Sequence, residues 1–297
     1  MEGLVSSTAS AWAGGEKEIR MSVSKGGVPV LKARLVRSKE VVLDWVDILL
    51  GRRDWSKPPR RLMFVGGGDF SKIGERYLNF FVDVCGLKPD DSVLDAGCGV
   101  GRLAIPLTRY LSPPGAYRGF DVVRPGIEWC SQAITPRFPH FQFEWANIYN
   151  KTYNPQGTMT AADFRFPYEN QQFDFIFLTS VFTHMLPGDV DHYLAEIARV
   201  LRPGKSCLTT YFLLNEESRR LMASGASRLD LRYGGRGYLT LDPALPESAV
   251  AHDEAFILAS LSRAGLAVDT SIRYGSWCGR KGTIRFQDEV VAKKAAG

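Results

Sequence analysis

One stretch, residues 92–104, constrains the fold of this chain more than any other. It reads SVLDAGCGVGRLA: a short apolar run ends in Asp95, three glycines alternate with other residues, and a helical pattern follows. This order predicts a strand, a tight glycine turn and a helix. Glycine permits positive φ and lets a ligand approach the backbone closely, and the helix directs its N–H groups and its positive end at that ligand.

The glycine spacing argues against a dinucleotide site. The glycines are Gly97, Gly99 and Gly101, and Arg102 stands where the fingerprint G-x-G-x-x-G has its third glycine. Asp95 precedes the turn, and a carboxylate there suits a ligand with positive charge better than a pyrophosphate. S-adenosylmethionine has an ammonium, a sulfonium and no phosphate, so it fits this turn. The alternative is a strand–helix turn that binds no ligand.

Three segments carry a family resemblance. VLDAGCGVGR resembles the first motif of class I S-adenosylmethionine-dependent methyltransferases, while FDFIFLTSVFTHM and EIARVLRPG are similar to later motifs of that family. The resemblance covers roughly residues 76–214. It implies an α/β, Rossmann-like fold: a seven-stranded, mostly parallel sheet with helices on both faces and the last strand antiparallel. We further expect an N-terminal helical extension and a cap insertion.

The apolar pattern along the chain agrees with such a sheet. Strands are predicted at 92–95, 117–120, 141–145, 173–178, 207–213, 266–274 and 284–292, and helices at 35–50, 73–85, 103–111, 126–133, 190–201 and 254–264. The strand at 173–178 is apolar on both faces, as is typical of a central parallel strand. The predicted divisions are an extension (1–60), a cofactor-binding core (61–214), a cap insertion (215–252) and the C-terminal part of the core sheet (253–297).

Asp121 ends the second predicted strand. It follows Asp95 by 121 − 95 = 26 residues, which is one β-α-β step. A carboxylate can accept two hydrogen bonds, so Asp121 suits both ribose hydroxyls; the alternative is an ordinary helix cap. With the resemblance, the predicted cofactor-binding residues are Asp95, Gly97, Cys98, Gly99, Arg102, Asp121, Val122, Asn147, Ile148 and Thr179.

The adenine contact has two candidate positions. Asn147 follows the third predicted strand, where the family usually has an acid that helps to hold adenine. An amide oxygen also accepts a hydrogen bond, so Asn147 can serve. A competing alignment puts Asp163 at this position instead, because the connection at 150–165 is longer than usual and rich in turn formers.

Three other segments each have two interpretations. The glycine cluster at 64–70 is either a loop before a helix or a loop that folds over the cofactor. The basic, proline-containing segment 51–61 is either an exposed linker or a contact for an anionic substrate. The insertion at 215–252, where periodicity breaks, is either a substrate cap over the C-terminal edge of the sheet or a surface excursion. We expect the first ~20 residues to be poorly ordered.

His184 is the candidate catalytic residue. It follows the fourth predicted strand, at the end where open α/β sheets bind ligands. Its unperturbed pKa near ~6.5 suits a general base for an oxygen acceptor. The alternative is a structural or substrate-packing histidine. Asp69 and Tyr149 are weaker candidates, and we expect the other histidines to be ordinary: His140, His192 and His252.

Composition narrows the partners. The net charge of +5 slightly favours an anionic substrate but lacks the basic signature of nucleic-acid-binding proteins, so we expect no nucleic acid. Five scattered cysteines without a C-x-x-C pair predict neither a disulfide framework nor a metal site, and favour the reducing cytoplasm. The N-terminus lacks signal-peptide features and no apolar run has membrane-spanning length, so no membrane partner is expected.

The sequence therefore predicts methyl transfer from S-adenosylmethionine to a small-molecule or glycan-type acceptor, with O-methylation favoured. Three alternatives are a non-methylating enzyme such as an aminopropyl transferase, a nucleic-acid modifying enzyme, and a regulatory protein that binds the cofactor without turnover. No dense acidic pocket for a polyamine and no long aromatic-basic stripe supports the first two. The acceptor and the oligomeric state are open at this stage.

Overall fold

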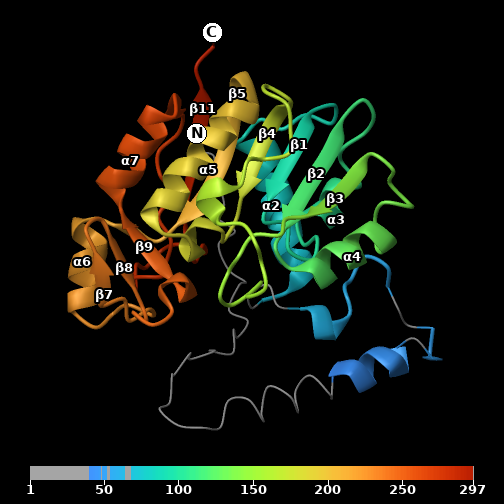
Figure 1. Ribbon diagram of the computed structural model, residues 1–297, viewed down its shortest axis with the longest axis horizontal. Coiled ribbons are helices and arrows are strands. Elements are labelled where there is room, and N and C mark those ends of the chain that lie inside the picture. Colours follow the sequence, from blue (N-terminus) through green and yellow to red (C-terminus); the bar gives the residue numbers. More distant parts are fainter. Residues whose placement is uncertain (1–39, 48, 52–53, 64–67, 297) are drawn as a thin grey trace, which may run out of the picture.

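The centre of the molecule is one seven-stranded sheet with the order β10-β11-β5-β4-β1-β2-β3 (Figure 1). The structure is a computed structural model that describes residues 40–47, 49–51, 54–63 and 68–296. Only β11 runs antiparallel to its neighbours, β5 and β10, in this sheet. This confirms the predicted Rossmann-like fold. The strands are β1 (Ser92–Ala96), β2 (Ala116–Asp121), β3 (Phe141–Trp145), β4 (Phe173–Leu178), β5 (Leu201–Tyr211), β10 (Leu266–Val268) and β11 (Asp288–Lys294).

Helices cover both faces of the sheet, as predicted (Figure 1). Side chains alternate between the faces along a strand. Val93 accordingly lies in a core with Phe81, whereas its neighbour Leu94 lies in a separate core with Leu194. One face carries α2 (Phe70–Asp83), α3 (Ala104–Leu107) and α4 (Arg124–Ala133), and the other carries α5 (Pro187–Val200) and α7 (Glu254–Arg263).

The helix after the glycine turn is much shorter than the predicted 103–111. Pro106 has no N–H to donate, so it cannot continue the α-helical bonding pattern. Thr108 N is shared between Ala104 O (3.1 Å) and Ile105 O (3.2 Å), and Tyr110 N donates to Leu107 O (3.0 Å). The i→i−3 bonds from Thr108 to Ile105 and from Tyr110 to Leu107 make the rest of the predicted helix a series of tight turns.

Several strands also differ from their predicted bounds, and β11 begins at Asp288 rather than at residue 284 and ends at Lys294 rather than at residue 292. β5 begins at Leu201, directly after α5, and the register with β4 jumps from Phe173–Leu201 to Phe175–Ser206. Pro203 and Gly204 therefore lie in an irregularity inside the strand. β10 ends at Val268 rather than at residue 274, and beyond it an isolated bridge joins Arg273 to Glu289.

The insertion folds around a small sheet of its own that the sequence did not predict. Its strands in order are β6 (Leu213–Leu214), β9 (Val250–Asp253), β8 (Tyr238–Thr240) and β7 (Tyr233–Gly235), and it carries the helix α6 (Glu216–Ala223). A third apolar core, which includes Phe212, Ala251 and Trp277, joins this sheet to the connection between β10 and β11. The insertion is therefore packed against the main domain.

Part of the N-terminal extension is described. Residues 40–47 are helical, within the predicted 35–50, and the Asp44 carboxylate accepts from Arg60 N (2.8 Å) and pairs with Arg61 Nη1 (2.9 Å). Two arginines of the basic segment thus contact this helix, since Arg60 also pairs with Asp47 (3.1 Å). The predicted disorder of the first ~20 residues and most of the glycine cluster at 64–70 lie outside the described residues.

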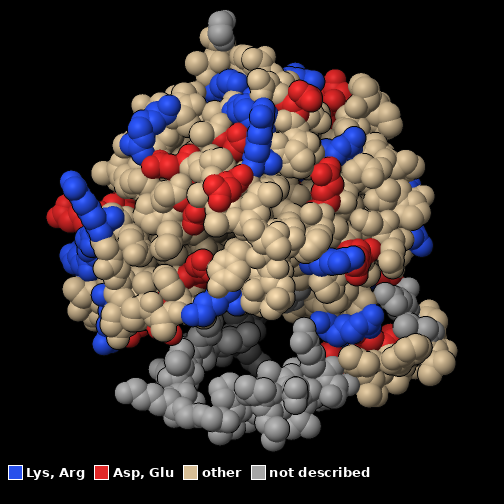
Figure 2. Space-filling view, in the orientation of Figure 1, with Lys and Arg blue, Asp and Glu red and all other residues tan. Residues whose placement is uncertain are grey.

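Charge is mixed on the surface. On the face drawn in Figure 2, basic and acidic side chains are interspersed rather than gathered by sign. Within the described ranges, no helix combines the length and the apolar character that crossing a membrane requires.

Candidate functional site

The glycine turn after β1 is held against the end of β2. Gly97 N and Cys98 N both donate to Phe120 O, at 2.8 and 3.1 Å, and Gly99 N donates to Asp121 Oδ2 at 2.8 Å. Gly97 and Gly99 have φ values of +93° and +58°, which glycine adopts without strain. The turn and Asp121, predicted separately from the sequence, are therefore directly bonded.

Asp121 is fixed in orientation and still has acceptor capacity. Its side chain is largely buried (9% exposed), and Oδ1 accepts from Val123 N at 2.8 Å. Burial raises the pKa of this carboxyl, while the backbone N–H groups act in the opposite direction. Each carboxylate oxygen has two lone pairs, so each has room for one more donor.

Asp95 lies beneath the turn and is almost fully buried (1% exposed). Its Oδ2 accepts from Tyr117 Oη at 2.7 Å, whereas Oδ1 has no hydrogen-bond partner in the described part of the chain. Burial raises the pKa of this carboxyl well above its usual range. A buried acceptor without a donor is costly, so this oxygen fits a donor that a ligand brings.

The loop after β4 closes on the glycine turn. A Cβ built on Gly97 would lie 2.3 Å from Val181 Cγ2, so the close approach at Gly97 is made by Val181. Thr179 begins this loop, and Ser180 follows with φ +60° and donates its N–H to Thr210 Oγ1 at 2.8 Å. Thr179 and the turn thus share one edge of the sheet.

Arg102 and Cys98 have specific surroundings. The Arg102 guanidinium lies 5.5 Å from the centre of the Phe70 ring, at the start of α2, and burial lowers its pKa. The Cys98 thiol is buried and in tight contact with β2: a Cβ built on Gly119 would lie 3.0 Å from Cys98 Sγ. The Cys98 thiol therefore packs against β2.

The two adenine candidates lie in different settings. Ala146 N donates to Asp121 O (3.0 Å), so Asn147 follows directly beside Asp121, and its Nδ2 donates to Thr158 Oγ1 (3.0 Å). Asp163 comes 163 − 147 = 16 residues later, in the 3-10 helix η2 (Ala161–Asp163), exposed and bonded to Thr160 Oγ1 (2.5 Å). Two other predicted residues lie near Asn147: Ile148, buried, and Val122, whose carbonyl accepts from Trp145 Nε1 (3.1 Å).

His184 lies in the 3-10 helix η3 (Phe182–His184) after β4. Its Nδ1 is 2.8 Å from Glu247 O, in η4 (Pro246–Ser248) of the insertion. A carbonyl oxygen can only accept, so Nδ1 carries the proton and Nε2 keeps a free lone pair in the neutral ring. Burial lowers the pKa of His184, and the ring lies edge-on to Tyr153 at 5.7 Å.

The segment after β3 reaches the insertion at the same place. Lys151 Nζ donates to Ala244 O at 2.8 Å. The loop after β3, the loop after β4 and the insertion therefore meet at the carboxyl end of the sheet. The sequence does not indicate the contacts of Glu247 and Lys151, because no local pattern marks a contact between residues that lie up to about a hundred positions apart.

The remaining candidates have local roles. Asp69 caps α2 by accepting from Lys72 N (2.9 Å), and Tyr149 is exposed. Each of the other histidines lies beside one backbone carbonyl: His140 Nε2 and Leu111 O (3.4 Å), His192 Nε2 and Phe164 O (2.9 Å), and His252 Nε2 and Phe182 O (3.1 Å).

Part of the chain is similar in sequence to known methyltransferases. Residues 94–209 match the family model described as a methyltransferase domain. Phthiotriol/phenolphthiotriol dimycocerosates methyltransferase 1 of Mycobacterium ulcerans is 32% identical over 118 residues, which cover 40% of this chain and 36% of the relative. 2-Phytyl-1,4-naphtoquinone methyltransferase of Trichormus variabilis is 28% identical over 120 residues, which cover 40% of this chain and 45% of the relative.

A solved structure agrees in fold. Magnesium protoporphyrin IX methyltransferase from Synechocystis, determined with bound SAH, has a TM-score of 0.50 and 16% identity, with 80% of this chain and 92% of that chain covered. The chain therefore contains a segment similar to a methyltransferase domain, residues 94–209, within a fold like that of this solved structure. It spans less than half the length of the two curated relatives it matches (36% and 45%).

Proposed function

We propose that this protein transfers a methyl group from S-adenosylmethionine to a hydroxyl oxygen of a small-molecule or glycan-type acceptor. One observation carries the proposal: the Gly99 N–H joins the glycine turn to the Asp121 carboxylate at 2.8 Å, above the buried Asp95. Two carboxylates at the turn favour a cationic ligand with vicinal hydroxyls over a pyrophosphate.

We assign the cofactor contacts on this basis. When bound, S-adenosylmethionine supplies a methyl group made electrophilic by the sulfonium. Asp121 would accept from the ribose hydroxyls, and Asp95 Oδ1 would face the positive end of the ligand. Asn147 and Ile148 would hold the adenine, since they follow β3 beside Asp121. The other assigned contacts are Gly97, Cys98, Gly99, Arg102, Val122 and Thr179.

His184 is the proposed general base. Its lowered pKa keeps the ring neutral at pH 7, so Nε2 can accept the acceptor's hydroxyl proton as the oxygen attacks. The bond to Glu247 O (2.8 Å) fixes the tautomer that this role needs. Most of the remaining barrier is lowered by holding the acceptor oxygen in line with the methyl group.

The insertion at 215–252 is the proposed acceptor cap. Its contacts with His184 and Lys151 support a position above the transfer site. The proposed divisions around it are the extension (1–60), the cofactor-binding core (61–214) and the C-terminal part of the core sheet (253–297). All five cysteines are free thiols, which supports a reducing compartment, the cytoplasm.

The test is transfer of a labelled methyl group to a panel of hydroxyl-, amine- and carbon-nucleophile acceptors. We expect a product from hydroxyl acceptors only. Calorimetry with S-adenosylhomocysteine is run in parallel, because a folded protein that does not bind it contradicts the proposal. Binding without any product would instead favour the regulatory alternative, since a fold does not by itself fix an activity.

A further inference from the structure

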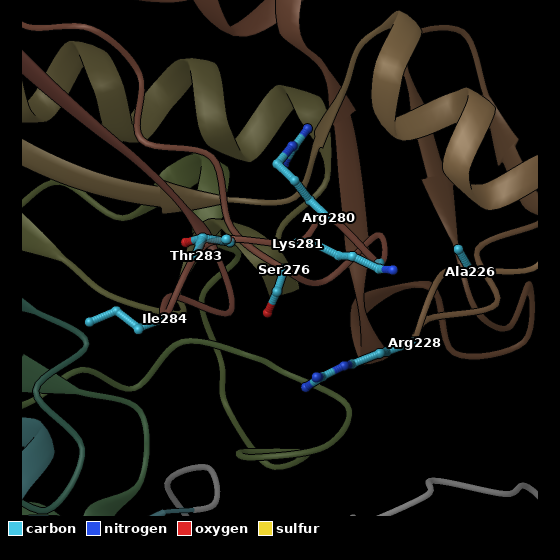
Figure 3. A pocket seen from close by; sticks show the side chains of 9 residues that line it. Ala226, Arg228, Ser276, Arg280, Lys281, Thr283 and Ile284 are labelled. Carbon is cyan, nitrogen blue, oxygen red and sulfur yellow. The ribbon is translucent and has the colours of Figure 1, made fainter. Parts of the chain in front are cut away.

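A pocket of about 580 Å³ lies between the insertion and the connection that joins β10 to β11 (Figure 3). Ala226 and Arg228 come from the insertion, and Ser276 and residues 279–284 come from the connection. Arg228 N donates to Trp277 O at 3.0 Å, and a Cβ built on Gly279 would lie 2.3 Å from Ala226 O. The two walls are therefore locked together by backbone contacts, and the pocket is preformed.

The charge of this pocket is of one sign. Its described lining residues include three cations, Arg228, Arg280 and Lys281, and no carboxylate. Arg280 is already compensated, because it pairs with Glu217 at 2.8 Å and with the buried Asp288 at 3.5 Å. In Figure 3 its side chain turns away from Ser276.

Arg228 and Lys281 are not compensated in this way. Both are exposed, and neither forms an ion pair with any carboxylate of the residues that the structure describes. In Figure 3 their charged ends and the Ser276 hydroxyl lie around the same hollow. A planar guanidinium, an ammonium and a hydroxyl are together the donors that bind oxyanions.

Hydrogen bonds link the pocket to the proposed transfer site through Gln287, the residue before β11. Ser276 N donates to Arg285 O (2.8 Å), two residues before Gln287. Gln287 Oε1 accepts from Ser180 Oγ (3.1 Å) and Thr210 Oγ1 (2.7 Å), and Ser180 stands between Thr179 and Val181 in the loop that closes on Gly97. A chain of hydrogen bonds therefore links the wall of this pocket to the loop that closes on the glycine turn.

We propose that Arg228, Lys281 and Ser276 bind an oxyanion group of the acceptor, a phosphate, sulfate or carboxylate, while its hydroxyl lies at the transfer site. The identification of the ligand as the methyl acceptor rests on the proposed function, whereas the binding of an anion at this pocket does not depend on it. It selects anionic hydroxyl compounds from the wider class of small-molecule and glycan-type acceptors.

The test uses pyrophosphate and citrate as probes in calorimetry at low salt. We expect both to bind the wild type, with affinity that falls as salt rises. The double variant Arg228→Gln with Lys281→Gln should lose at least tenfold in affinity. The matched control, Arg263→Gln with Lys293→Gln, removes the same charge from α7 and β11 and should bind as the wild type does.

Two outcomes overturn the proposal: no probe binding to the wild type, or equal loss in the double variant and the control. Binding of pyrophosphate alone indicates a phosphate or sulfate ester, and binding of citrate as well indicates that carboxylates are accepted. S-adenosylhomocysteine affinity is measured on the same samples and should be unchanged in the double variant. If the wild type fails to bind it while the probes still bind, the methyltransferase proposal fails and the anion site stands.

Discussion

At the scale of single residues, the site depends on two buried carboxylates with different surroundings. Each oxygen of Asp121 accepts one backbone N–H, from Gly99 or Val123, whereas Asp95 Oδ1 has no donor among the described residues. The backbone bonds fix the orientation of the Asp121 side chain. The open position at Asp95 Oδ1 could accept from a donor of the proposed ligand. Removal of the two carboxylates should therefore have different effects. Loss of Asp121 should weaken ligand binding, whereas loss of Asp95 should disturb the packing of the core around it.

Asp121→Ala should weaken S-adenosylhomocysteine binding by about 1.5–3 kcal/mol, because hydrogen bonds to a charged group are lost. Calorimetry measures this as a loss of roughly 10- to 150-fold. Asp90→Ala is the control, since Asp90 is exposed at the opposite end of β1. Unchanged affinity in a folded Asp121→Ala protein would exclude the ribose contact.

His184→Ala should lower kcat by ~10²–10⁴-fold, the usual cost of a lost general base, with little change in cofactor affinity. The rate should rise as pH increases through the His184 pKa, because only the neutral ring can act as the base. Burial lowers that pKa, so the wild-type rate should rise at a lower pH than the titration of a free imidazole would give. His140→Ala is the control, because His140 lies beside Leu111 O, away from the turn. A normal kcat for His184→Ala would make this histidine structural.

At the scale of elements, the insertion is the proposed acceptor cap. It has its own four-stranded sheet and core, and it touches the carboxyl end of the main sheet through η4 and Lys151. These contacts are few compared with those inside the main sheet. Such elements open at lower free energy than core strands do.

If the insertion is a cap, bound acceptor and S-adenosylhomocysteine should protect residues 215–252 from amide exchange. The main strands β1 and β4 provide the internal control, because they should exchange slowly with and without ligand. Hydrogen–deuterium exchange with mass spectrometry measures both. Equal exchange of 215–252 in the free and bound protein would identify a surface excursion.

At the scale of the whole molecule, the buried histidine of the insertion links folding to pH. His252 is fully buried, stacks on Phe256 and packs beside η3 through Phe182 O (3.1 Å). Burial lowers its pKa from 6.5 to about 4. Between these values the unfolded chain binds the proton and the folded chain does not, so stability falls as pH falls through this window.

His252 should therefore cost the folded state up to roughly 3 kcal/mol as pH is lowered from 7 to 4. Urea unfolding at several pH values measures this, and the comparison of interest is the wild type against His252→Gln. The variant should be less stable at pH 7 but should lose less on acidification. Parallel pH curves for the two proteins would show that this ring does not control acid stability.

The sequence by itself determined the main sheet, the glycine turn and the likeness to one methyltransferase class. These are local features: periods of two and 3.6 residues reveal strands and helices, and adjacent glycines reveal a turn. The strands β3 and β4 match the predicted bounds because each is a continuous run between clear turn signals. The position of Asp121 followed from the same regularity, since one β-α-β step brings it to the same edge as Asp95.

Only the tertiary structure decided what surrounds the site. The strands of the small sheet have two to four residues, too few for a period to be recognised. The contact between His184 and Glu247 joins residues 247 − 184 = 63 positions apart, and the Arg228–Lys281 pocket joins two segments more than fifty apart. Such contacts depend on how packed elements cross in space, and that information is spread over many side chains instead of being written in any one stretch.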